Sequence, residues 1–164
     1  MIAYEPEPHN HAELQHNTAV FPHVVTVRAA VAGSSGQLVL YRARSSVSHS
    51  LYQRAEADAS AACEPVQAIS LDELFAEHQI ERCDLLKLDI EGAEYEVIYG
   101  ASERTLARVA RLAAEYHDPR PDDPAARGRA LADYLHQHGF AVRLVPRPRH
   151  RNKGRLYAVR AGAG

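Results

Sequence analysis

The stretch DLLKLDIEGAEYEVIYG, residues 84–100, constrains the fold more than any other part of the sequence. Residues 84–88 are mostly aliphatic and lack polar–apolar alternation, which is typical of a strand covered on both faces. Residues 94–100 then place apolar side chains at helical spacing. Asp89 and Glu91 therefore lie where a buried strand passes into a helix.

In open α/β sheets, ligands bind at the carboxyl ends of the strands, so this junction is a candidate site. Acids also gather at helix N-termini, where the dipole and the free N–H groups favour them. That explanation suits Glu94, which we interpret as a helix N-terminal acid. It does not explain why the strand ends in Asp89, or why Gly92, which lets the backbone turn closely and approach a ligand, follows it.

Length and composition fit one globular domain over residues 1–164. The chain has 46% hydrophobic residues and a net charge of −2, and this charge argues against nucleic acid as the main partner. Two cysteines give neither a disulfide framework nor a zinc site, and no segment approaches the roughly 20 apolar residues of a membrane span. We expect a cytoplasmic protein. Abundant arginine and alanine fit a GC-rich bacterial genome.

Strand and helix patterns alternate along the chain. Strands are predicted over residues 2–5, 24–31, 37–41, 66–69, 84–89, 112–116, 140–145 and 155–159. Helices are predicted over residues 9–17, 70–78, 94–100, 105–109 and 125–138. The second helix opens with a capping box of Ser70 and Glu73, Asn17 caps the end of the first helix, and Gly139 closes the last.

The irregular segments between these elements carry predictions of their own. Residues 33–36, GSSG, form a turn after which residues 37–41 return antiparallel to residues 24–31. Residues 43–64 form a long loop. The order of elements predicts one α/β domain.

Five motifs occur in order across residues 2–145: IAYEPEPHNHAELQHN, SLDELF, DLLKLDIEGAEYEVIYGA, LAAEYHD and YLHQHGFAV. Together they resemble the FkbM-type S-adenosylmethionine-dependent methyltransferases. The resemblance implies a Rossmann-like class I methyltransferase sheet, seven-stranded and doubly wound, with its last strand antiparallel. It also implies S-adenosylmethionine as cofactor and methyl transfer to an oxygen, often a hydroxyl of a sugar, glycan or natural product.

The resemblance also assigns residues to the cofactor. Glu5, at the end of the first strand, occupies the position of the acid that accepts hydrogen bonds from the ribose hydroxyls, and one carboxylate can accept from both. Asn10, in the helix that follows, is assigned to the same site. Ala30 and Val31 would border the adenine, although small apolar residues there suit a core equally well. Asp89 faces the place where cofactor and acceptor meet.

Methyl transfer to a hydroxyl needs close positioning of the acceptor, and a base or a metal that takes its proton. Asp89, Glu91, Glu115 and His117 are the candidates for this catalytic role because they end adjacent strands. An imidazole has an ordinary pKa of about 6.5, which suits a base at neutral pH. A surface-loop histidine remains the alternative for His117.

Two further features have plainer interpretations. The histidines lack the i, i+4 spacing of helical metal ligands, so no metal site is predicted, and a carboxylate-and-histidine metal hydrolase is a weaker alternative. The basic segment RLVPRPRHRNKGR, residues 143–155, is interpreted as a solvated hairpin tip. Its alternative is a patch for an anionic acceptor.

One expected unit is not found in the sequence. A Rossmann-type methyltransferase has a strand, a glycine-rich turn and a helix before the strand that ends in its ribose-binding acid. Here Met1 stands almost directly before IAYEP, which predicts an N-terminally truncated domain without the first strand and helix. Residues 1–164 alone are then expected to bind S-adenosylmethionine very weakly, to show no methyl transfer and to self-associate through exposed strand edges. The alternative is a non-catalytic remnant that acts as a binding or assembly module.

Overall fold

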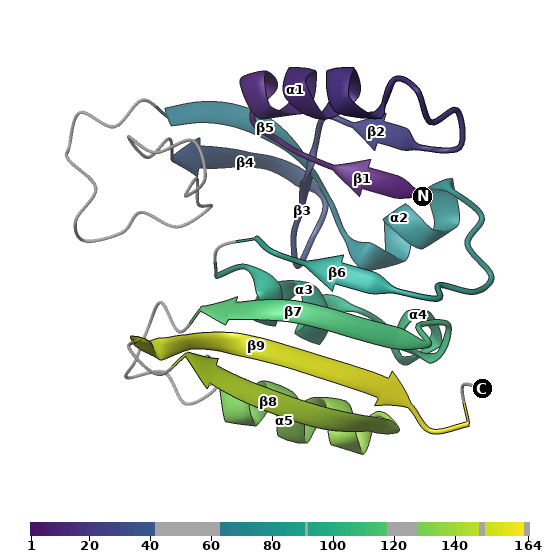
Figure 1. The fold of residues 1–164 in the computed structure, drawn as a ribbon, viewed down its shortest axis with the longest axis vertical. Helices are drawn as coiled ribbons and strands as arrows, with labels where there is room; N and C mark the ends of the chain where they lie inside the picture. The colour runs from purple at the N-terminus through teal and green to yellow at the C-terminus, as the bar shows by residue number, and fades with distance from the viewer. Residues whose placement is uncertain (42–62, 91, 118–127, 148–149, 163–164) are drawn as a thin grey trace.

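The computed structural model of the chain describes residues 1–41, 63–90, 92–117, 128–147 and 150–162. These residues form a mixed α/β structure, in which the first strands and the last strands lie in different sheets (Figure 1). Most of the predicted long loop, residues 43–64, lies outside the described residues. Its last two residues, Cys63 and Glu64, begin a strand.

The elements follow the predicted alternation of strands and helices. The strands are β1 (Ile2–Tyr4), β2 (Val25–Val27), β3 (Ala30–Val31), β4 (Gly36–Tyr41), β5 (Cys63–Ile69), β6 (Leu86–Leu88), β7 (Arg111–His117), β8 (Phe140–Arg147) and β9 (His150–Arg160). The helices are α1 (Pro8–Thr18), α2 (Leu71–Glu77), α3 (Glu94–Gly100), α4 (Glu103–Ala107) and α5 (Gly128–Gln137).

The strands are divided among three sheets. Their orders are β1-β2, β3-β5-β4 and β6-β7-β9-β8. β6 is parallel to β7, whereas β9 is antiparallel to both of its neighbours, β7 and β8, so the predicted antiparallel last strand is confirmed. The described residues do not form the expected single seven-stranded sheet, because β1 and β6 are not paired with each other and no described strand lies between them.

Two predictions are wrong, one about the extent of a strand and one about a strand pairing. Residues 24–31 are not one strand, because β2 pairs with β1 while β3 pairs with β5 in another sheet. The predicted antiparallel return to residues 24–31 is also not made. β4 pairs antiparallel with β5, and β5 lies between β3 and β4. Local sequence indicated extended structure but not the partner, which comes from a segment more than twenty residues further along the chain.

Two predicted helix ends need correction. Ser70 Oγ accepts the N–H of Glu73 at 3.2 Å, which confirms Ser70 as an N-cap. The reciprocal half of the capping box is not formed, because the Ser70 N–H donates instead to Ser35 Oγ at 2.9 Å. Asn17 lies inside α1, which runs on to Thr18, so its prediction as a cap is wrong. Gly139, with a φ of 82°, follows α5 as predicted.

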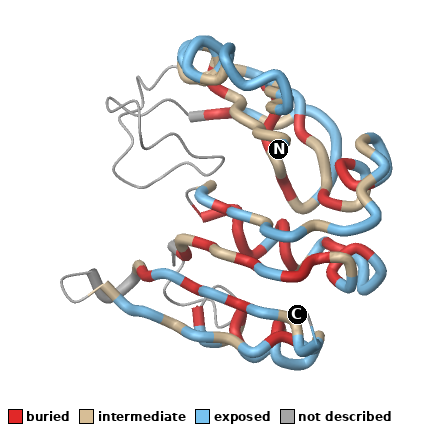
Figure 2. Tube along the Cα trace, turned by 45° about the vertical axis from the view of Figure 1, so that its right-hand side comes forward, coloured by how far each residue is buried: buried red, intermediate tan, exposed pale blue. Residues whose placement is uncertain are grey.

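The main core lies on one face of the four-stranded sheet. Leu112 and Ala114 of β7 are almost fully buried, and so are Leu156 and Ala158 of the neighbouring strand β9. The side chains that cover them come from α3, α4 and α5, and include Ile98, Leu106, Leu131 and Leu135. Figure 2 shows these buried stretches along the strands and the helices behind them.

The opposite face of this sheet is open. Leu85, just before β6, keeps 59% of its surface exposed, and Lys87 within β6 is also exposed. The prediction that residues 84–88 are covered on both faces is therefore wrong. Among the described residues, α3 and α5 lie behind the sheet in the view of Figure 1, and no helix covers the front of β6, β7, β9 and β8.

The basic segment 143–155 belongs to the antiparallel hairpin of β8 and β9, as predicted, but most of it is strand rather than tip. Residues 143–147 belong to β8 and residues 150–155 belong to β9. The two strands pair along this stretch, with a register shift between Pro146 and Arg147. Because side chains alternate along a strand, Arg143 and Arg155 point to the open face of the sheet, opposite the helices.

Asp72 joins α2 to α4. Its Oδ1 accepts the Ser102 N–H at 3.1 Å and the Ser102 hydroxyl at 3.0 Å. Ser102 is the N-cap of α4, where its Oγ accepts the Thr105 N–H at 3.2 Å. Burial acts to raise the pKa of Asp72, but hydrogen bonds from Thr105 and Ser102 outweigh it and hold the pKa below its ordinary value of 3.8.

We expect Asp72→Ala to lower the free energy of unfolding at pH 7 by about 1–2 kcal/mol, since the N-cap of α4 loses its support. A carboxylate with a lowered folded-state pKa contributes stability above its unfolded pKa, and that stability is lost as the pH falls through the folded pKa. The difference between wild type and variant should therefore shrink below a pH of about 4.

Urea unfolding followed by circular dichroism at several pH values measures this difference. Asp84→Ala is the matched control, because Asp84 is exposed and forms only a surface ion pair with Arg82 among the described residues. Two results would contradict the role of Asp72 in supporting the N-cap of α4. One is that Asp84→Ala lowers the free energy of unfolding as much as Asp72→Ala does. The other is that the difference in free energy between wild type and Asp72→Ala does not depend on pH.

Candidate functional site

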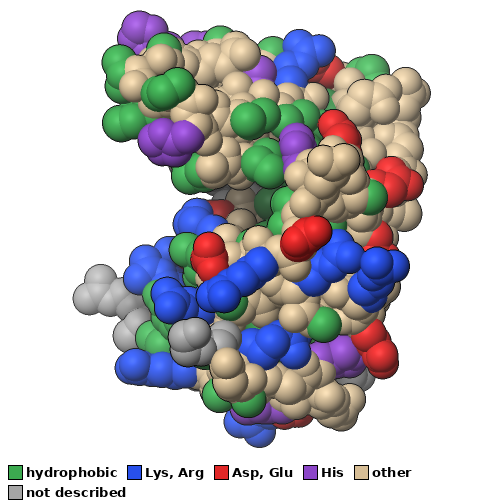
Figure 3. Space-filling model, turned by 90° about the vertical axis from the view of Figure 1, so that its right-hand side faces the viewer, with side chains coloured by type: hydrophobic (Ala, Val, Ile, Leu, Met, Phe, Trp, Pro, Cys, Tyr) green, Lys and Arg blue, Asp and Glu red, His purple; other side chains and the backbone are tan. Residues whose placement is uncertain are grey.

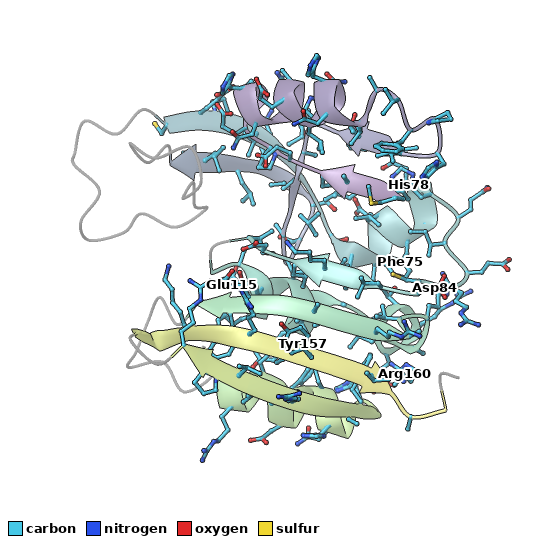
Figure 4. All side chains as sticks on the ribbon, in the orientation of Figure 1. Phe75, His78, Asp84, Glu115, Tyr157 and Arg160 are labelled. Atoms are coloured by element: carbon cyan, nitrogen blue, oxygen red, sulfur yellow. The ribbon has the colours of Figure 1, made fainter. Side chains whose placement is uncertain are left out.

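Asp89 and Glu115 are brought to neighbouring strand ends, as the sequence predicts. β6 and β7 run parallel with Leu88 opposite Ala114, so the next residues, Asp89 and Glu115, follow at the same level. Both lie on the open face, because the residues that alternate with them, Leu88 and Ala114, are buried on the helix side. Figure 4 shows Glu115 at the carboxyl end of β7.

Each of these carboxylates has a basic side chain beside it. Lys87 Nζ lies 3.2 Å from Asp89 Oδ2, and the Asp89 side chain is 44% exposed. Arg147 forms an ion pair with Glu115, whose side chain is 19% exposed. Exposed ion pairs contribute little stability. A ligand that approaches Asp89 therefore displaces Lys87 at small cost, and the carboxylate is available as a hydrogen-bond acceptor.

The other two predicted catalytic residues are only partly located. Glu91 lies outside the described residues. His117 is the last residue of β7, opposite Lys153 of β9, which confirms its place at the strand end, and its side chain lies outside the described part. Arg155 of β9 is directly opposite Glu115, which places one residue of the predicted basic patch beside the candidate site.

Glu5 follows β1 directly, and the turn after the strand orients its side chain. The Glu5 N–H donates to Val27 of β2 at 3.1 Å, and Glu5 Oε1 accepts the Glu7 N–H at 2.9 Å. Its second oxygen has no hydrogen-bond partner among the described residues. A carboxylate held at a strand end with one oxygen available suits the predicted acceptor of ribose hydroxyls.

Glu7 is a buried acid that sequence reasoning missed. Its side chain is almost completely buried, and its Oε2 accepts the Asn10 N–H at 2.7 Å as the N-cap of α1. The signal was present in the sequence, since Glu7 precedes Pro8, a residue favoured in the first turn of a helix. Glu7 therefore fixes the start of α1 and the turn that carries Glu5.

The remaining predicted cofactor residues lie near β1 in sequence but serve different parts of the structure. Asn10 is in the first turn of α1. Ala30 is 3% exposed and packs in a small core with Leu40 and Val66, and Val31 packs against the main core. Ala30 is therefore a core residue, as the alternative interpretation predicted. Contact of Ala30 and Val31 with adenine stays a prediction.

An adenosyl cofactor needs acceptors for its ribose hydroxyls and backbone N–H groups close to its charged end. Glu5 fits the first need. The second is not met near β1, because the first glycines of the chain, Gly33 and Gly36, follow β3. Since β1 and β6 lie in separate sheets, the described residues form two partial sites: Glu5 beside β1, and Asp89 with Glu115 at the ends of β6 and β7.

Glu94 shapes the turn after Asp89. Its carboxylate is fully buried and accepts the N–H groups of Ile90 at 3.2 Å and Gly92 at 2.9 Å. Gly92 has a φ of 111°, a backbone angle that residues other than glycine rarely adopt. The prediction that Glu94 is a helix N-terminal acid is confirmed, and its hydrogen bonds satisfy a carboxylate that is costly to bury.

The described residues contain neither a candidate metal cluster nor a helix suited to cross a membrane. No group of three or more His, Cys, Asp or Glu side chains in this part of the chain is placed to hold a metal ion. Within the same residues, no helix combines the length and the apolar character that crossing a membrane requires.

Comparison with known proteins decides the family. The profile of the methyltransferase FkbM domain matches residues 1–142. The chain belongs to the FkbM methyltransferase family. The methyltransferase FkbM of Methylobacillus flagellatus KT has a similar fold, with a TM-score of 0.56 and 15% identity. That match covers 96% of this FkbM chain and 36% of the other.

A second relative is much larger. The AMB antimetabolite synthetase AmbE of Pseudomonas aeruginosa is 42% identical over 74 residues, which are 45% of this FkbM chain and 4% of AmbE. The chain therefore spans about a third of one relative and a small part of the other. The match establishes kinship with a segment of AmbE.

We expect Glu94→Gln to loosen the turn after Asp89, because an amide has one acceptor oxygen where the carboxylate has two. Glu94→Ala should loosen it further. Native-state hydrogen exchange should show faster exchange of the Ile90 and Gly92 amides in both variants.

The matched control is Glu81→Ala, which removes an exposed acid near β6. Exchange at Ile90 and Gly92 that is unchanged in Glu94→Ala, or equally changed in Glu81→Ala, would show that Glu94 does not hold this turn.

Proposed function

We propose that this FkbM domain serves S-adenosylmethionine-dependent O-methyl transfer to a hydroxyl of a sugar or another natural product. Family membership supports methyl transfer. The observation that carries the assignment of residues is the pair Asp89 and Glu115, which lie level at the ends of two adjacent parallel strands. The similarity to a segment of an antimetabolite synthetase supports a natural product as acceptor.

When bound, the cofactor supplies a methyl group carried on a sulfonium. Glu5 would hold the ribose by accepting hydrogen bonds from its hydroxyls, and this contact would orient the donor without entering the reaction. Asp89 would accept a hydrogen bond from the acceptor hydroxyl and take its proton as the bond between oxygen and methyl carbon forms and the bond between methyl carbon and sulfur breaks. Glu115, held by Arg147, would offer the substrate a second hydrogen-bond acceptor.

The second candidate function is a non-catalytic binding or assembly module. The observation that favours it is the division of Glu5 and Asp89 between two unpaired sheets, together with the open face of the four-stranded sheet. A module of this kind would bind partners through the open face and would need no cofactor. We likewise propose that methyl transfer by residues 1–164 alone is impaired, because the described residues offer Glu5 no glycine-rich turn beside it.

Substitution of Asp89 separates these functions. In a polypeptide that carries residues 1–164 and transfers methyl groups, Asp89→Asn should lower kcat by about 10²–10⁴-fold, because the amide cannot take the acceptor proton. Transfer of a labelled methyl group from S-adenosylmethionine measures kcat, and urea unfolding checks that stability is kept.

Asp84→Asn is the matched control, since Asp84 precedes the same strand but is exposed at its opposite end. It should leave kcat within a few-fold of wild type. If Asp89→Asn also retained nearly full activity, the catalytic role of Asp89 would be wrong. If no polypeptide that carries residues 1–164 bound S-adenosylmethionine or transferred a methyl group, the module would be the better account.

A further inference from the structure

The open face is the side of the four-stranded sheet that points away from α3 and α5. Its central row crosses all four strands in the order Lys87, Ala113, Tyr157 and Arg143, from β6 through β7 and β9 to β8. Register places Arg111 opposite Val159 on one side of this row and Glu115 opposite Arg155 on the other. The open face therefore extends over three rows of cross-strand neighbours.

Large apolar side chains are exposed across the open face. Tyr157 is 42% exposed and Val159 45% exposed, and Leu85 and Val145 are also among the exposed large hydrophobic residues. Ala113 lies between Lys87 and Tyr157 and leaves room above it. Exposed apolar side chains that are cross-strand neighbours, with charged side chains among them, are typical of an interaction site in soluble proteins.

The charges on the open face are mostly positive, although the chain as a whole has a net charge of −2. Lys87 and Arg143 end the central row at the two outer strands, while Arg111 and Arg155 lie above and below it. The two acids of the open face, Asp89 and Glu115, are both paired with basic side chains. Among the described residues, Arg111, Arg143 and Arg155 have no ion-pair partner. Figure 3 shows Lys and Arg side chains gathered on this half of the molecule.

We propose that the open face binds an amphipathic α-helix that has an apolar stripe and acidic flanks. Neighbouring strands lie about 4.8 Å apart, so the row from Lys87 to Arg143 spans about 14 Å. A helix with its side chains is about 10–12 Å wide. Such a helix covers Ala113 and Tyr157 with its apolar stripe and places its acidic side chains beside Lys87 and Arg143.

Other occupants suit the open face less well. A second copy of this chain would bring the same basic side chains against their equivalents, which is unfavourable. An anionic membrane would match the charge, but a twisted four-stranded sheet is not flat and would meet a bilayer over only part of its width. This inference goes beyond methyl transfer and does not depend on it.

The test uses a fluorescein-labelled synthetic peptide that is helical, with a leucine stripe flanked by glutamates, and a twin flanked by lysines. Fluorescence anisotropy with residues 1–164 should show that the glutamate peptide binds at least about tenfold more tightly than its twin. The double variant Lys87→Glu/Arg143→Glu should reverse this preference, and Tyr157→Ser should weaken binding of both peptides.

Arg104→Glu/Arg129→Glu is the matched control, because it makes the same charge change at exposed positions on α4 and α5. It should keep the wild-type preference. Circular dichroism confirms that each variant is folded, and a variant that is not folded is replaced by the single change Arg143→Glu.

Three results would overturn the proposal. The first is equal binding of the two peptides, or no binding of either. The second is the same loss of preference in the control variant as in Lys87→Glu/Arg143→Glu. The third is evidence for another occupant of the open face. Such evidence is binding to phosphatidylglycerol vesicles without binding to the glutamate peptide, or a dimer in sedimentation velocity that Tyr157→Ser dissociates.

Discussion

The packing of α3 and α5 on one face of β7 and β9 determines most of this structure. Side chains alternate along a strand, so burial of Leu112, Ala114 and Tyr116 against the helices forces the residues between them onto the other face. The same packing buries Leu88 on β6 and directs Asp89 outward beside Glu115. The candidate site and the open face are therefore two consequences of a single core.

Tyr116 shows how closely that core is fitted. Its ring lies against Gly128 at the start of α5 and Gly154 of β9, and a Cβ atom at Gly128 would come within 2.7 Å of the ring. Close fits of this kind resist displacement, because interiors are packed as densely as organic crystals. The carboxylates at the strand ends are thus held on a rigid base. The ion pair of Asp89 with Lys87 is exposed enough to exchange for a ligand, whereas Glu115 is more buried and stays paired with Arg147.

Local sequence predicted the elements but not their partners. The strand before Asp89, the helix from Glu94 and the N-cap at Ser70 all follow from patterns within a few residues, and all are found. The pairing of β3 and β4 with β5, and the Ser35 hydroxyl that replaces Glu73 at the cap, depend on segments distant in sequence. The aliphatic run at residues 84–88 indicated burial on both faces, yet whether an element covers the second face is decided by tertiary structure, which a strand's own residues do not encode.

We propose that Glu5 and Asp89 belong to one methyl-donor site, to which the described residues contribute no glycine-rich turn beside β1. A titration of this chain with S-adenosylhomocysteine, followed by two-dimensional NMR of the backbone amides, tests it most directly. We expect saturable but weak binding, with a Kd of about a millimolar. The described residues offer no glycine-rich turn beside Glu5, and each hydrogen bond that such a turn would donate to the ligand is worth about 1 kcal/mol. The shifted amides should include both Glu5 and Asp89. Micromolar binding, or shifts confined to residues away from both carboxylates, would contradict the account.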